Sequence, residues 1–496
     1  MKKIAAFVMA LALACTSVPA NLDVQTGTEI VFAAQATAIN SEQDLIAMQN
    51  NPKGNYYLAK DITITKKLNM YPDYTDDNGD YRVDYFMGTL DGKGHKIKNY
   101  AGIGLFDNAK NATFKNIVMT NVTIEGTESA AALVYSAKKC TFSNITVSGS
   151  TKTDGAGIAF TVENCDFTDC TSKVDANIKA EKGVWICFAG ITWGSAGSTF
   201  KNCKNKGNLK VTSESVDDVS FKLCGITTYA KSVENCSNSG NITIENTEKN
   251  DPEYGPAITA CGVIEECRKK ITGCSNTGNI SVINKGGKKS TTRAALSGVF
   301  RSSGKAASRC YNTGNISYKG VCTDYSLDKA IEVEGVGTGY GTSECYNTGK
   351  ITVKLTSGTA CVGGVSYAGT KLRNCYNTGA VSLTGNGLVG GIAATFNDGY
   401  SNYNTGKISG KGKTIYKGEI AGNAGYSYSD GVSVYDNYYT GSGKKSGSES
   451  TSWKPYQSKA KKVSSITFGN CPKLSSKYWT YSSKHKRLIL KNNKEA

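Results

Sequence analysis

One nine-residue phrase recurs along the chain and constrains its fold more than any other feature. It reads NCYNTGAVS at Asn374, and related phrases begin at Asn202, Asn235, Gly273, Arg309 and Glu344, with divergent copies at Ser401 and Asp436. Counted from the cysteine position, successive copies are separated by 33, 38, 36, 35, 30, 27 and 35 residues. A constant core with variable spacing indicates one structural unit whose loops differ in length.

Each copy offers two or three short strands and no segment of helical length. Three positions of the phrase are predicted to point inward, as Cys375, Asn377 and Val381 do in the copy at Asn374. The residues beside them, Tyr376 and Ser382, are predicted to point outward. Gly379 is predicted to supply a left-handed or otherwise restricted conformation between two strands. A second apolar, glycine-rich run precedes most copies, as in CGVIEEC at Cys261.

A unit of this kind cannot bury its own apolar face, so copies must stack on one another. Stacking in register pairs each strand in parallel with its successor at roughly 4.8 Å. Cysteines then lie over cysteines, and asparagine amides bond along the stack, which satisfies a buried polar position. A propeller blade needs four strands and a leucine-rich repeat needs leucines that are absent. The sequence therefore predicts an all-β, single-stranded parallel β-helix.

Three phrases carry a family resemblance. GLVG at Gly387–Gly390 matches a GLUG-type repeat, and GTLDGKGHKIKN at Gly88 and WTYSSKHKRLILKNN at Trp479 match the opening and closing of the same group. The chain resembles the right-handed β-helix surface proteins of Gram-positive anaerobic bacteria that carry such repeats. The resemblance implies a right-handed helix, export and an adhesin-like role.

The chain divides into four predicted parts. Residues 1–33 have the layout of a signal peptide, with Lys2 and Lys3 before an apolar run, and cleavage is expected after Ala33 in preference to Ala20. Lipidation at Cys15 is disfavoured because Ala12 stands where a lipobox has leucine. Residues 34–87 form an N-terminal cap and first strands, 88–440 the repeats and 441–496 a basic C-terminal cap. No transmembrane segment or LPxTG motif is found, so we expect a secreted protein, retained at the cell surface by other means.

Two N-terminal segments have local signatures. Ser41–Gln49 reads as a short capped helix that covers the first rung, where an open sheet edge would recruit other chains. Asp73–Asp84 imitates part of a calcium loop, but Tyr74 and Tyr85 occupy the places of the first and last ligands. A solvated acidic loop is the favoured interpretation.

The sixteen cysteines after Cys15 are expected to be mostly reduced and buried, because stacked side chains hold their Cβ atoms wider apart than a relaxed disulfide needs. The chain has no CxxC pair, and its two histidines, His95 and His485, are far apart. We therefore predict no metal site. We also expect no cofactor, and we expect the protein to be a monomer.

The alternative function is that of a β-helix polysaccharide lyase or glycoside hydrolase. The nearest approach to a catalytic set is Glu265, Glu266, Arg268 and Lys269 beside the loop acids Asp217, Asp218, Asp251 and Glu253. Charges on adjacent rungs more often form a solvated face. GLUG-type repeats also occur in some large metallopeptidases, but the chain has no HExxH motif. No catalytic residue is assigned, and the protein is expected not to be an enzyme.

The favoured function is binding of polysaccharide, cell wall or a host ligand. Tyr311, Tyr346, Tyr376, Tyr403 and Tyr438 follow the cysteine position and are expected to form an outward strip that either packs on itself or binds sugar rings.

Residues 441–496 carry twelve lysines and one arginine against two glutamates, a net charge of +11 out of +17. The densest clusters are Lys459, Lys461 and Lys462, and Lys484, Lys486 and Arg487. They predict attachment to an anionic polymer such as wall teichoic acid or a uronic-acid polysaccharide, because nucleic acid is not expected outside the cell. The other interpretation of these charges is a solubilising surface.

Overall fold

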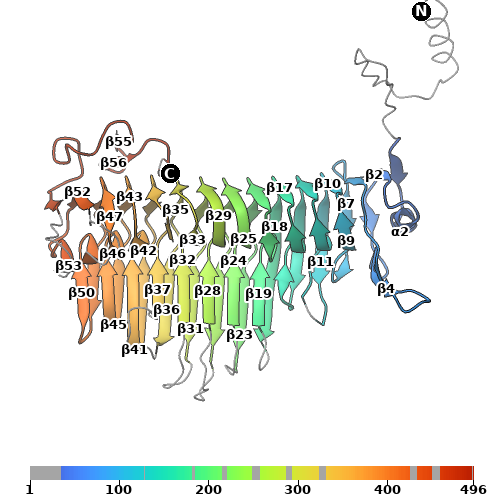
Figure 1. The fold of residues 1–496 in the computed structure, drawn as a ribbon, viewed down its shortest axis with the longest axis horizontal. Coiled ribbons are helices and arrows are strands. Elements are labelled where there is room, and N and C mark those ends of the chain that lie inside the picture. The colour runs from blue at the N-terminus through green and yellow to red at the C-terminus, as the bar shows by residue number, and fades with distance from the viewer. Residues whose placement is uncertain are drawn as a thin grey trace, which may run out of the picture.

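The computed structural model describes residues 35–127, 129–180, 185–214, 220–247, 257–285, 293–322, 331–424, 433–449, 459–493 and 495. It is a parallel β-helix, in which strands of successive repeats lie side by side along one long axis (Figure 1). A 44-stranded sheet and two 4-stranded sheets account for most pairings, and all pairings given for the 44-stranded sheet are parallel. The predicted fold class is confirmed. The predicted signal peptide with Cys15, and the acids Asp217, Asp218, Asp251 and Glu253, lie outside the described residues.

The rungs contribute strands to four columns. The first column contains β1 (Thr37–Ile39), β2 (Asn55–Leu58), β6 (Thr89–Asp91), β10 (Thr113–Lys115), β13 (Thr141–Ser143), β17 (Asp166–Thr168), β21 (Thr199–Lys201), β34 (Ala307–Ser308), β39 (Thr342–Ser343), β43 (Leu372–Arg373) and β47 (Asp398–Tyr400). The second contains β3 (Ile62–Thr63), β7 (Lys96–Lys98), β8 (Ala101–Gly102), β11 (Val118–Ile124), β14 (Thr146–Thr151), β18 (Thr171–Ala180), β22 (Lys204–Asn205), β23 (Leu209–Ser213), β26 (Ser237–Asn238), β27 (Ile242–Asn246), β30 (Ser275–Asn276), β31 (Ile280–Asn284), β35 (Tyr311–Asn312), β36 (Ile316–Val321), β40 (Tyr346–Asn347), β41 (Ile351–Gly363), β44 (Tyr376–Asn377), β45 (Val381–Gly390), β48 (Tyr403–Asn404) and β49 (Ile408–Lys411).

The third column contains β15 (Gly155–Ala156), β19 (Trp185–Ala189), β24 (Ser220–Cys224), β28 (Ala257–Cys261), β32 (Arg293–Ser297), β37 (Ile331–Glu334), the ends of β41 and β45, and β50 (Ile415–Gly418). The fourth contains β9 (Phe106–Lys110), β12 (Val134–Lys138), β16 (Ala159–Glu163), β20 (Ser195–Ala196), β25 (Thr227–Glu234), β29 (Ile264–Thr272), β33 (Phe300–Ser303), β38 (Gly337–Gly339), β42 (Ser366–Gly369), β46 (Ala393–Phe396), β51 (Ala421–Ala424) and β53 (Ser446–Glu449). The ends of β25 and β29 also continue the first column.

The core between the columns is a set of in-register side-chain stacks. In the N-terminal rungs Phe114, Phe142, Phe167 and Phe200 stack with ring centroids 5.1, 4.4 and 5.1 Å apart. In the rungs closer to the C-terminus, cysteines and β-branched residues fill much of the interior. Identical residues over one another present matching shapes at the strand spacing, which is why a repeat sequence specifies this packing.

The cysteine column is present as predicted. The backbone N–H of Cys203 lies 3.4 Å from Cys236 Sγ, and that of Cys310 lies 3.3 Å from Cys345 Sγ. All sixteen cysteines among the described residues are buried, and none of them is in a disulfide. The expectation of one internal column without cross-rung disulfides is confirmed.

The second asparagine of each phrase forms a buried ladder. Its Nδ2 donates to the Oδ1 of the next copy, at 2.7 Å from Asn205 to Asn238 and 2.8 Å from Asn276 to Asn312. The same Nδ2 donates to the carbonyl oxygen two residues ahead, at 2.8 Å for Asn276. These amides are fully or almost fully buried, so the ladder satisfies polar groups that would otherwise be left without partners.

Gly379 does not have the left-handed φ that was one of the two conformations predicted for it. The left-handed backbone belongs to the residue before the cysteine, as in Asn374 with φ 53° and Glu344 with φ 52°. Gly379 is instead required by close packing, because a Cβ there would lie 2.0 Å from the carbonyl oxygen of Gly349 on the preceding rung. The glycine column therefore brings adjacent turns together.

The N-terminal cap follows its sequence signature. Helix α2 (Glu42–Ala47) is capped by Ser41, whose Oγ accepts from the Asp44 N–H at 3.1 Å, while Asp44 accepts from the Asn40 N–H at 2.8 Å. A 3-10 turn, η1 (Met48–Asn50), continues it. The acidic loop is an antiparallel hairpin of β4 (Asp73–Thr75) and β5 (Tyr81–Val83).

The C-terminal part adds a last rung and then turns back. Strands β52 (Ser433–Tyr439) and β54 (Lys459–Lys462) pair in parallel. The chain then folds back along the outside of the helix through β55 (Trp479–Ser482) and β56 (Arg487–Leu490), an antiparallel pair (Figure 1). Residues 463–495 are called the return segment below.

Candidate functional site

The five predicted tyrosines form one stack under the return segment. Rings of Tyr311, Tyr346, Tyr376 and Tyr403 are parallel within 8°, with centroids 4.9 to 5.0 Å apart. Tyr438 extends the column by register with Tyr403. Four of the five are at most 3% exposed. The expected outward position is correct, and of the two interpretations the rings follow the first: they pack on one another, and the return segment covers these four.

Specific contacts hold the return segment on the stack. The Trp479 ring lies 5.3 and 6.0 Å from the Tyr403 and Tyr376 rings. The Tyr403 hydroxyl donates to the Leu488 carbonyl at 2.6 Å, and the Tyr376 hydroxyl donates to Glu495 at 2.8 Å. A role for these tyrosines in sugar binding stays a prediction, and it requires the return segment to move.

The predicted basic residues divide into two kinds. Lys459, Lys461, Lys462, Lys484 and Lys486 are exposed. Arg487 is not open to an external anion as these lysines are, because its side chain is only 12% exposed and its guanidinium pairs with Glu495 at 2.5 Å. Arg487 therefore anchors the return segment, together with the stack beneath it.

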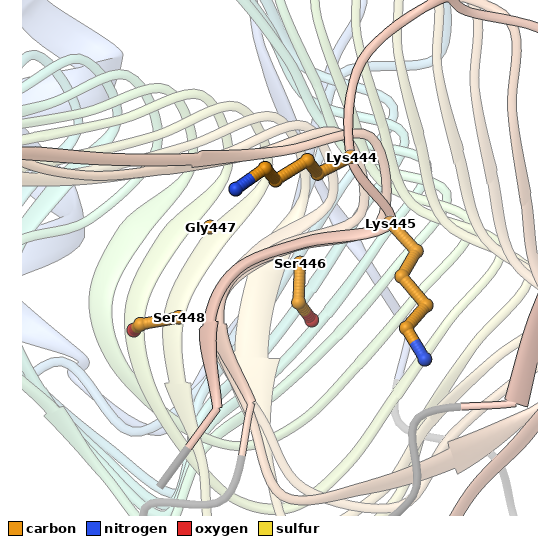
Figure 2. Close-up of a pocket in the computed structure, with 5 residues that line it drawn as sticks. All are labelled: Lys444, Lys445, Ser446, Gly447 and Ser448. Carbon is orange, nitrogen blue, oxygen red and sulfur yellow. The ribbon is translucent and has the colours of Figure 1, made fainter.

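Exposed lysines are numerous over the C-terminal end. Nine are exposed between residues 441 and 493 and form no ion pair within the described residues: Lys444, Lys459, Lys461, Lys462, Lys473, Lys477, Lys484, Lys486 and Lys491. Lys444 and Lys445 border a hollow of about 420 Å³ with Ser446, Gly447 and Ser448, and their ammonium groups point in different directions (Figure 2). Lys459, Lys461 and Lys462 lie on β54, the last strand paired to the long sheet.

A second polar cluster lies on the outside of the corner between the third and fourth columns, called the outer corner below. On β24, Lys222 and Cys224 alternate with the core residues Phe221 and Leu223, so they face away from the core. Cys224 is nevertheless buried. The chain bends at Gly225, and outward side chains of the two columns meet across the bend.

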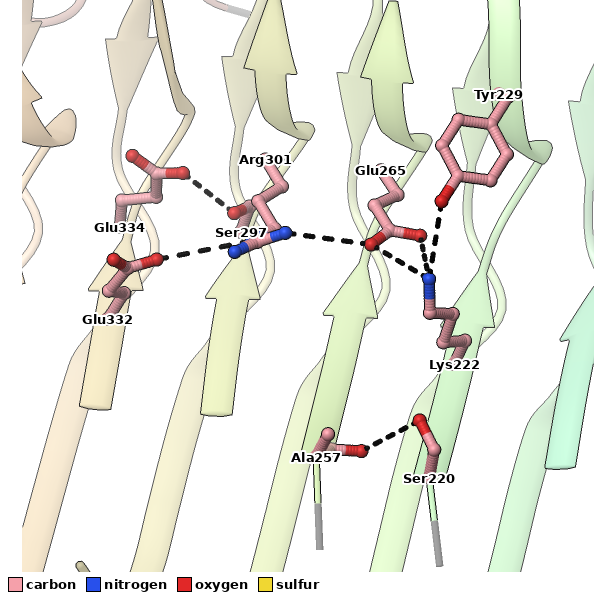
Figure 3. Close-up of polar contacts among 9 residues, drawn as sticks. All are labelled: Ser220, Lys222, Tyr229, Ala257, Glu265, Ser297, Arg301, Glu332 and Glu334. Atoms are coloured by element: carbon pink, nitrogen blue, oxygen red, sulfur yellow. Dashed lines mark hydrogen bonds and ion pairs between the residues drawn. The ribbon is translucent and has the colours of Figure 1, made fainter. Parts of the chain in front are cut away.

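Charges alternate along the outer corner (Figure 3). Lys222 Nζ lies 3.1 Å from Glu265, and Arg301 lies 3.6 Å from Glu265 and 4.0 Å from Glu332. Glu265 is 7% exposed and belongs to β29, whereas its lysine partner belongs to β24. The corner therefore pairs charges across both rungs and columns.

Glu334 ends this row as a buried acid. Its oxygens accept from Ser297 Oγ at 2.7 Å, from Thr338 Oγ1 at 2.7 Å and from the Tyr367 N–H at 3.0 Å. Burial raises the pKa of Glu334 to about 8, and burial also raises the pKa of its neighbour Glu332. Glu334 is therefore mainly protonated at neutral pH.

The predicted catalytic candidates are only partly brought together. Glu265 lies in the outer corner, but Glu266, Arg268 and Lys269 are exposed residues further along β29. Sequence reasoning missed Lys222, Arg301, Glu332 and Glu334. Aligning the second apolar runs around their glycines, CGITTY, CGVIEE, SGVFRS and EGVGTG, would have placed these residues in neighbouring rungs.

Another hollow, of about 510 Å³, lies beside this corner. It is lined by Thr161, Val162, Glu163, Gly194, Gly197, Tyr229, Ala230 and Arg268. Tyr229 also faces the charged row, with its hydroxyl 3.4 Å from Lys222 Nζ (Figure 3).

The described residues contain neither a metal-binding cluster nor a membrane-spanning helix. Within the described ranges, no three His, Cys, Asp or Glu side chains are grouped so as to hold a metal ion. In the same ranges, no helix is long and apolar enough to cross a membrane. His95 lies 3.6 Å from Asp61 and His485 lies 3.7 Å from Glu495.

Comparison with known proteins gives one family match. Residues 33–149 match the family model of the M26 IgA1-specific metallo-endopeptidase N-terminal region. No curated protein matches the chain. The matched residues comprise the N-terminal cap and the first rungs, so the chain is similar to the N-terminal region of such peptidases over its own N-terminal part.

Proposed function

We propose that the protein is an exported, non-catalytic β-helix protein that attaches to an anionic cell-surface polymer through its C-terminal lysines. The observation that carries the proposal is the set of nine exposed lysines without described ion pairs. Elsewhere some surface lysines are paired, as Lys138 with Glu163 and Lys210 with Glu245, whereas others, such as Lys60, form no ion pair within the described residues. The C-terminal lysines differ in being gathered in one region, and exposed cations concentrated in one region attract a polyanion at long range.

The family match supports an extracellular setting. The matched model describes part of a peptidase specific for IgA1, a secreted antibody, and such an enzyme meets its substrate outside the cell. The apolar run that follows Lys2 and Lys3 supports the same setting, as the layout of a signal peptide.

The outer corner supports a non-catalytic assignment. The Glu265 carboxylate is paired with Lys222 and Arg301, and Glu334 is hydrogen-bonded to Ser297, Thr338 and the Tyr367 N–H. A catalytic acid or base must reach a substrate proton. These two residues are instead buried and engaged with the protein.

Binding to a polyanion can be tested with lysine variants of the full chain. The combined change Lys459→Gln, Lys461→Gln and Lys462→Gln removes three charges from β54. The matched control removes three charges from exposed residues at the other end of the helix, Lys60→Gln, Lys66→Gln and Lys67→Gln. Binding to purified wall teichoic acid or polygalacturonate is measured at 0.05 to 1 M salt.

We expect the C-terminal variant to bind much more weakly and the control to bind as the natural chain does. Binding of the natural chain should weaken strongly as the Debye length falls to about 3 Å at 1 M salt. Equal loss in the two variants would show that net charge, not the C-terminal placement, governs binding. Unchanged binding in both would refute the proposal.

A further inference from the structure

The hollow beside Tyr229 results from a missing side chain. Ala159, Thr192 and Thr227 bridge one another on three successive rungs. Two residues further along, these rungs carry Thr161, Gly194 and Tyr229. Gly194 has no side chain, and an added Cβ would have no atom within 4 Å. The gap of one rung between Thr161 and Tyr229 accounts for the open volume of about 510 Å³.

The groups around this gap combine one free cation with hydroxyl and carboxylate partners. Arg268 is exposed and forms no ion pair within the described residues. Tyr229 is 37% exposed, so part of its ring is open to a ligand. Glu163 accepts from Lys138 at 2.9 Å and from Asn164 Nδ2 at 3.2 Å, which leaves further acceptor capacity. Thr161 adds an exposed hydroxyl.

The local charge favours an anionic ligand. Glu163 is balanced by Lys138, and Lys222 by Glu265, which also meets Arg301. Arg268 is left as the unbalanced charge in the lining. Its planar guanidinium can bind a carboxylate through two parallel hydrogen bonds.

We propose that this hollow binds one uronic-acid residue of an acidic saccharide. The Arg268 guanidinium pairs with the sugar carboxylate, the open part of the Tyr229 ring contacts the apolar face of the sugar, and Thr161 and Glu163 hydrogen-bond its hydroxyls. This site goes beyond the proposed attachment, because it uses a short-range fit at other residues and not the C-terminal lysines.

The probe is tetragalacturonate, titrated into the full chain by calorimetry at 0.15 M salt. The titrations use the variant that carries Lys459→Gln, Lys461→Gln and Lys462→Gln, so that weak binding at the C-terminal end does not contribute. The comparison probes are a neutral cellotetraose and inorganic phosphate. We expect tetragalacturonate to bind and both comparison probes to bind at least about tenfold more weakly, because each lacks one of the two recognised features.

Two single changes form a matched pair. Arg268→Gln removes the proposed carboxylate partner, and Lys269→Gln removes the same charge from the next residue, which does not line the hollow. Arg268→Gln should weaken tetragalacturonate binding about tenfold or more, and Lys269→Gln should leave it within about twofold. Gly194→Asn, a residue type that tolerates the φ of 64° at this position, should fill the hollow and abolish binding.

Equal effects of Arg268→Gln and Lys269→Gln, or equal binding of phosphate, would overturn the uronate site. Those outcomes leave the attachment proposal untouched, because the two members of the matched pair differ only at the hollow and both lack the three β54 lysines. Conversely, if the polyanion-binding experiment with the lysine variants fails, the tetragalacturonate titrations still test the hollow. The far-ultraviolet spectrum of every variant is recorded to establish that the β-helix is intact.

Discussion

The asparagine ladder provides the most direct test of how the repeats are held together. Asn312 is fully buried and takes part in three hydrogen bonds: it accepts from Asn276 Nδ2 at 2.8 Å, and its own Nδ2 donates to Asn347 Oδ1 and to the Gly314 carbonyl at 2.8 Å. The change Asn312→Ala removes all three at once and interrupts the ladder in its middle.

The expected cost follows from the groups left behind. One Nδ2 proton, one Oδ1 and one backbone carbonyl lose their partner in a buried position, and each unsatisfied group costs about 1–3 kcal/mol. Partial relaxation and entry of water reduce the sum, so we expect a loss of about 3–5 kcal/mol.

Asn315→Ala is the matched control in the same rung. Asn315 is exposed, and its Oδ1 accepts one hydrogen bond, from the Lys350 N–H at 3.0 Å. An exposed hydrogen bond contributes about 0.5–1.5 kcal/mol, so this variant should be only slightly destabilised. Both variants lose one asparagine amide, but Asn312 is buried within the ladder and Asn315 is exposed outside it.

Unfolding in urea, followed by circular dichroism, compares the midpoints of the natural chain and both variants. A stack of repeats need not unfold in one step, so hydrogen exchange of peptides from Asn276 to Asn347 is measured as well. Asn312→Ala should lower the midpoint clearly and speed exchange in these rungs. Equal midpoints and equal exchange for the two variants would refute the view that the buried ladder stabilises the stack.

Four further outcomes are expected. Gly298→Ala should prevent correct stacking, because its Cβ would lie 1.8 Å from the Gly335 carbonyl oxygen. Gly469→Ala, with no atom within 4 Å of the added Cβ, should unfold at the same temperature as the natural chain. Equal thermal unfolding of the two variants would contradict the close-packing argument. Stability should fall as pH rises from about 4.5 to about 8, because the folded chain keeps on Glu334 a proton that the unfolded chain releases, and Glu334→Gln should flatten this slope in thermal unfolding; an unchanged slope would exclude that acid as its source. Trp479→Ala, which removes a fully buried ring at a cost of about 3–5 kcal/mol, should expose the return segment to limited proteolysis while the rungs resist, and an unchanged digestion pattern would show that the segment is held by other contacts. Thiol titration should find almost no reactive cysteine in the folded protein and the sixteen described cysteines after unfolding without reductant, whereas a count near zero after unfolding would mean that they are paired.

Much of the fold could be predicted from the recurring phrase alone. Repeated cysteines and asparagines at nearly constant spacing can be buried only if copies stack in register, and the structure places them in one thiol column and one amide ladder. The N-terminal cap was also predictable, because Ser41 and Asp44 make a local capping signature that needs no distant partner. Interactions between neighbouring copies, or within one turn, repeat in the sequence and can be recognised there.

Contacts between unlike segments could not be predicted in this way. Trp479 covers Tyr403 and Tyr376 although it lies far along the chain from both, and no repeat relates the return segment to the stack beneath it. The charged row of the outer corner combines Lys222 on one strand with Glu265 on another strand of the next rung.

The recurring phrase is enough to specify a stack of β-rungs with a cysteine and asparagine interior, because in-register packing of identical residues follows from the repeat. Which outward residues remain accessible depends on the assembled structure. Burial of the tyrosines depends on where the return segment lies, and the hollow at Gly194 depends on the register that places Thr161 and Tyr229 on the rungs to either side of it. Accessibility is a property of the assembled surface, so no local pattern encodes it.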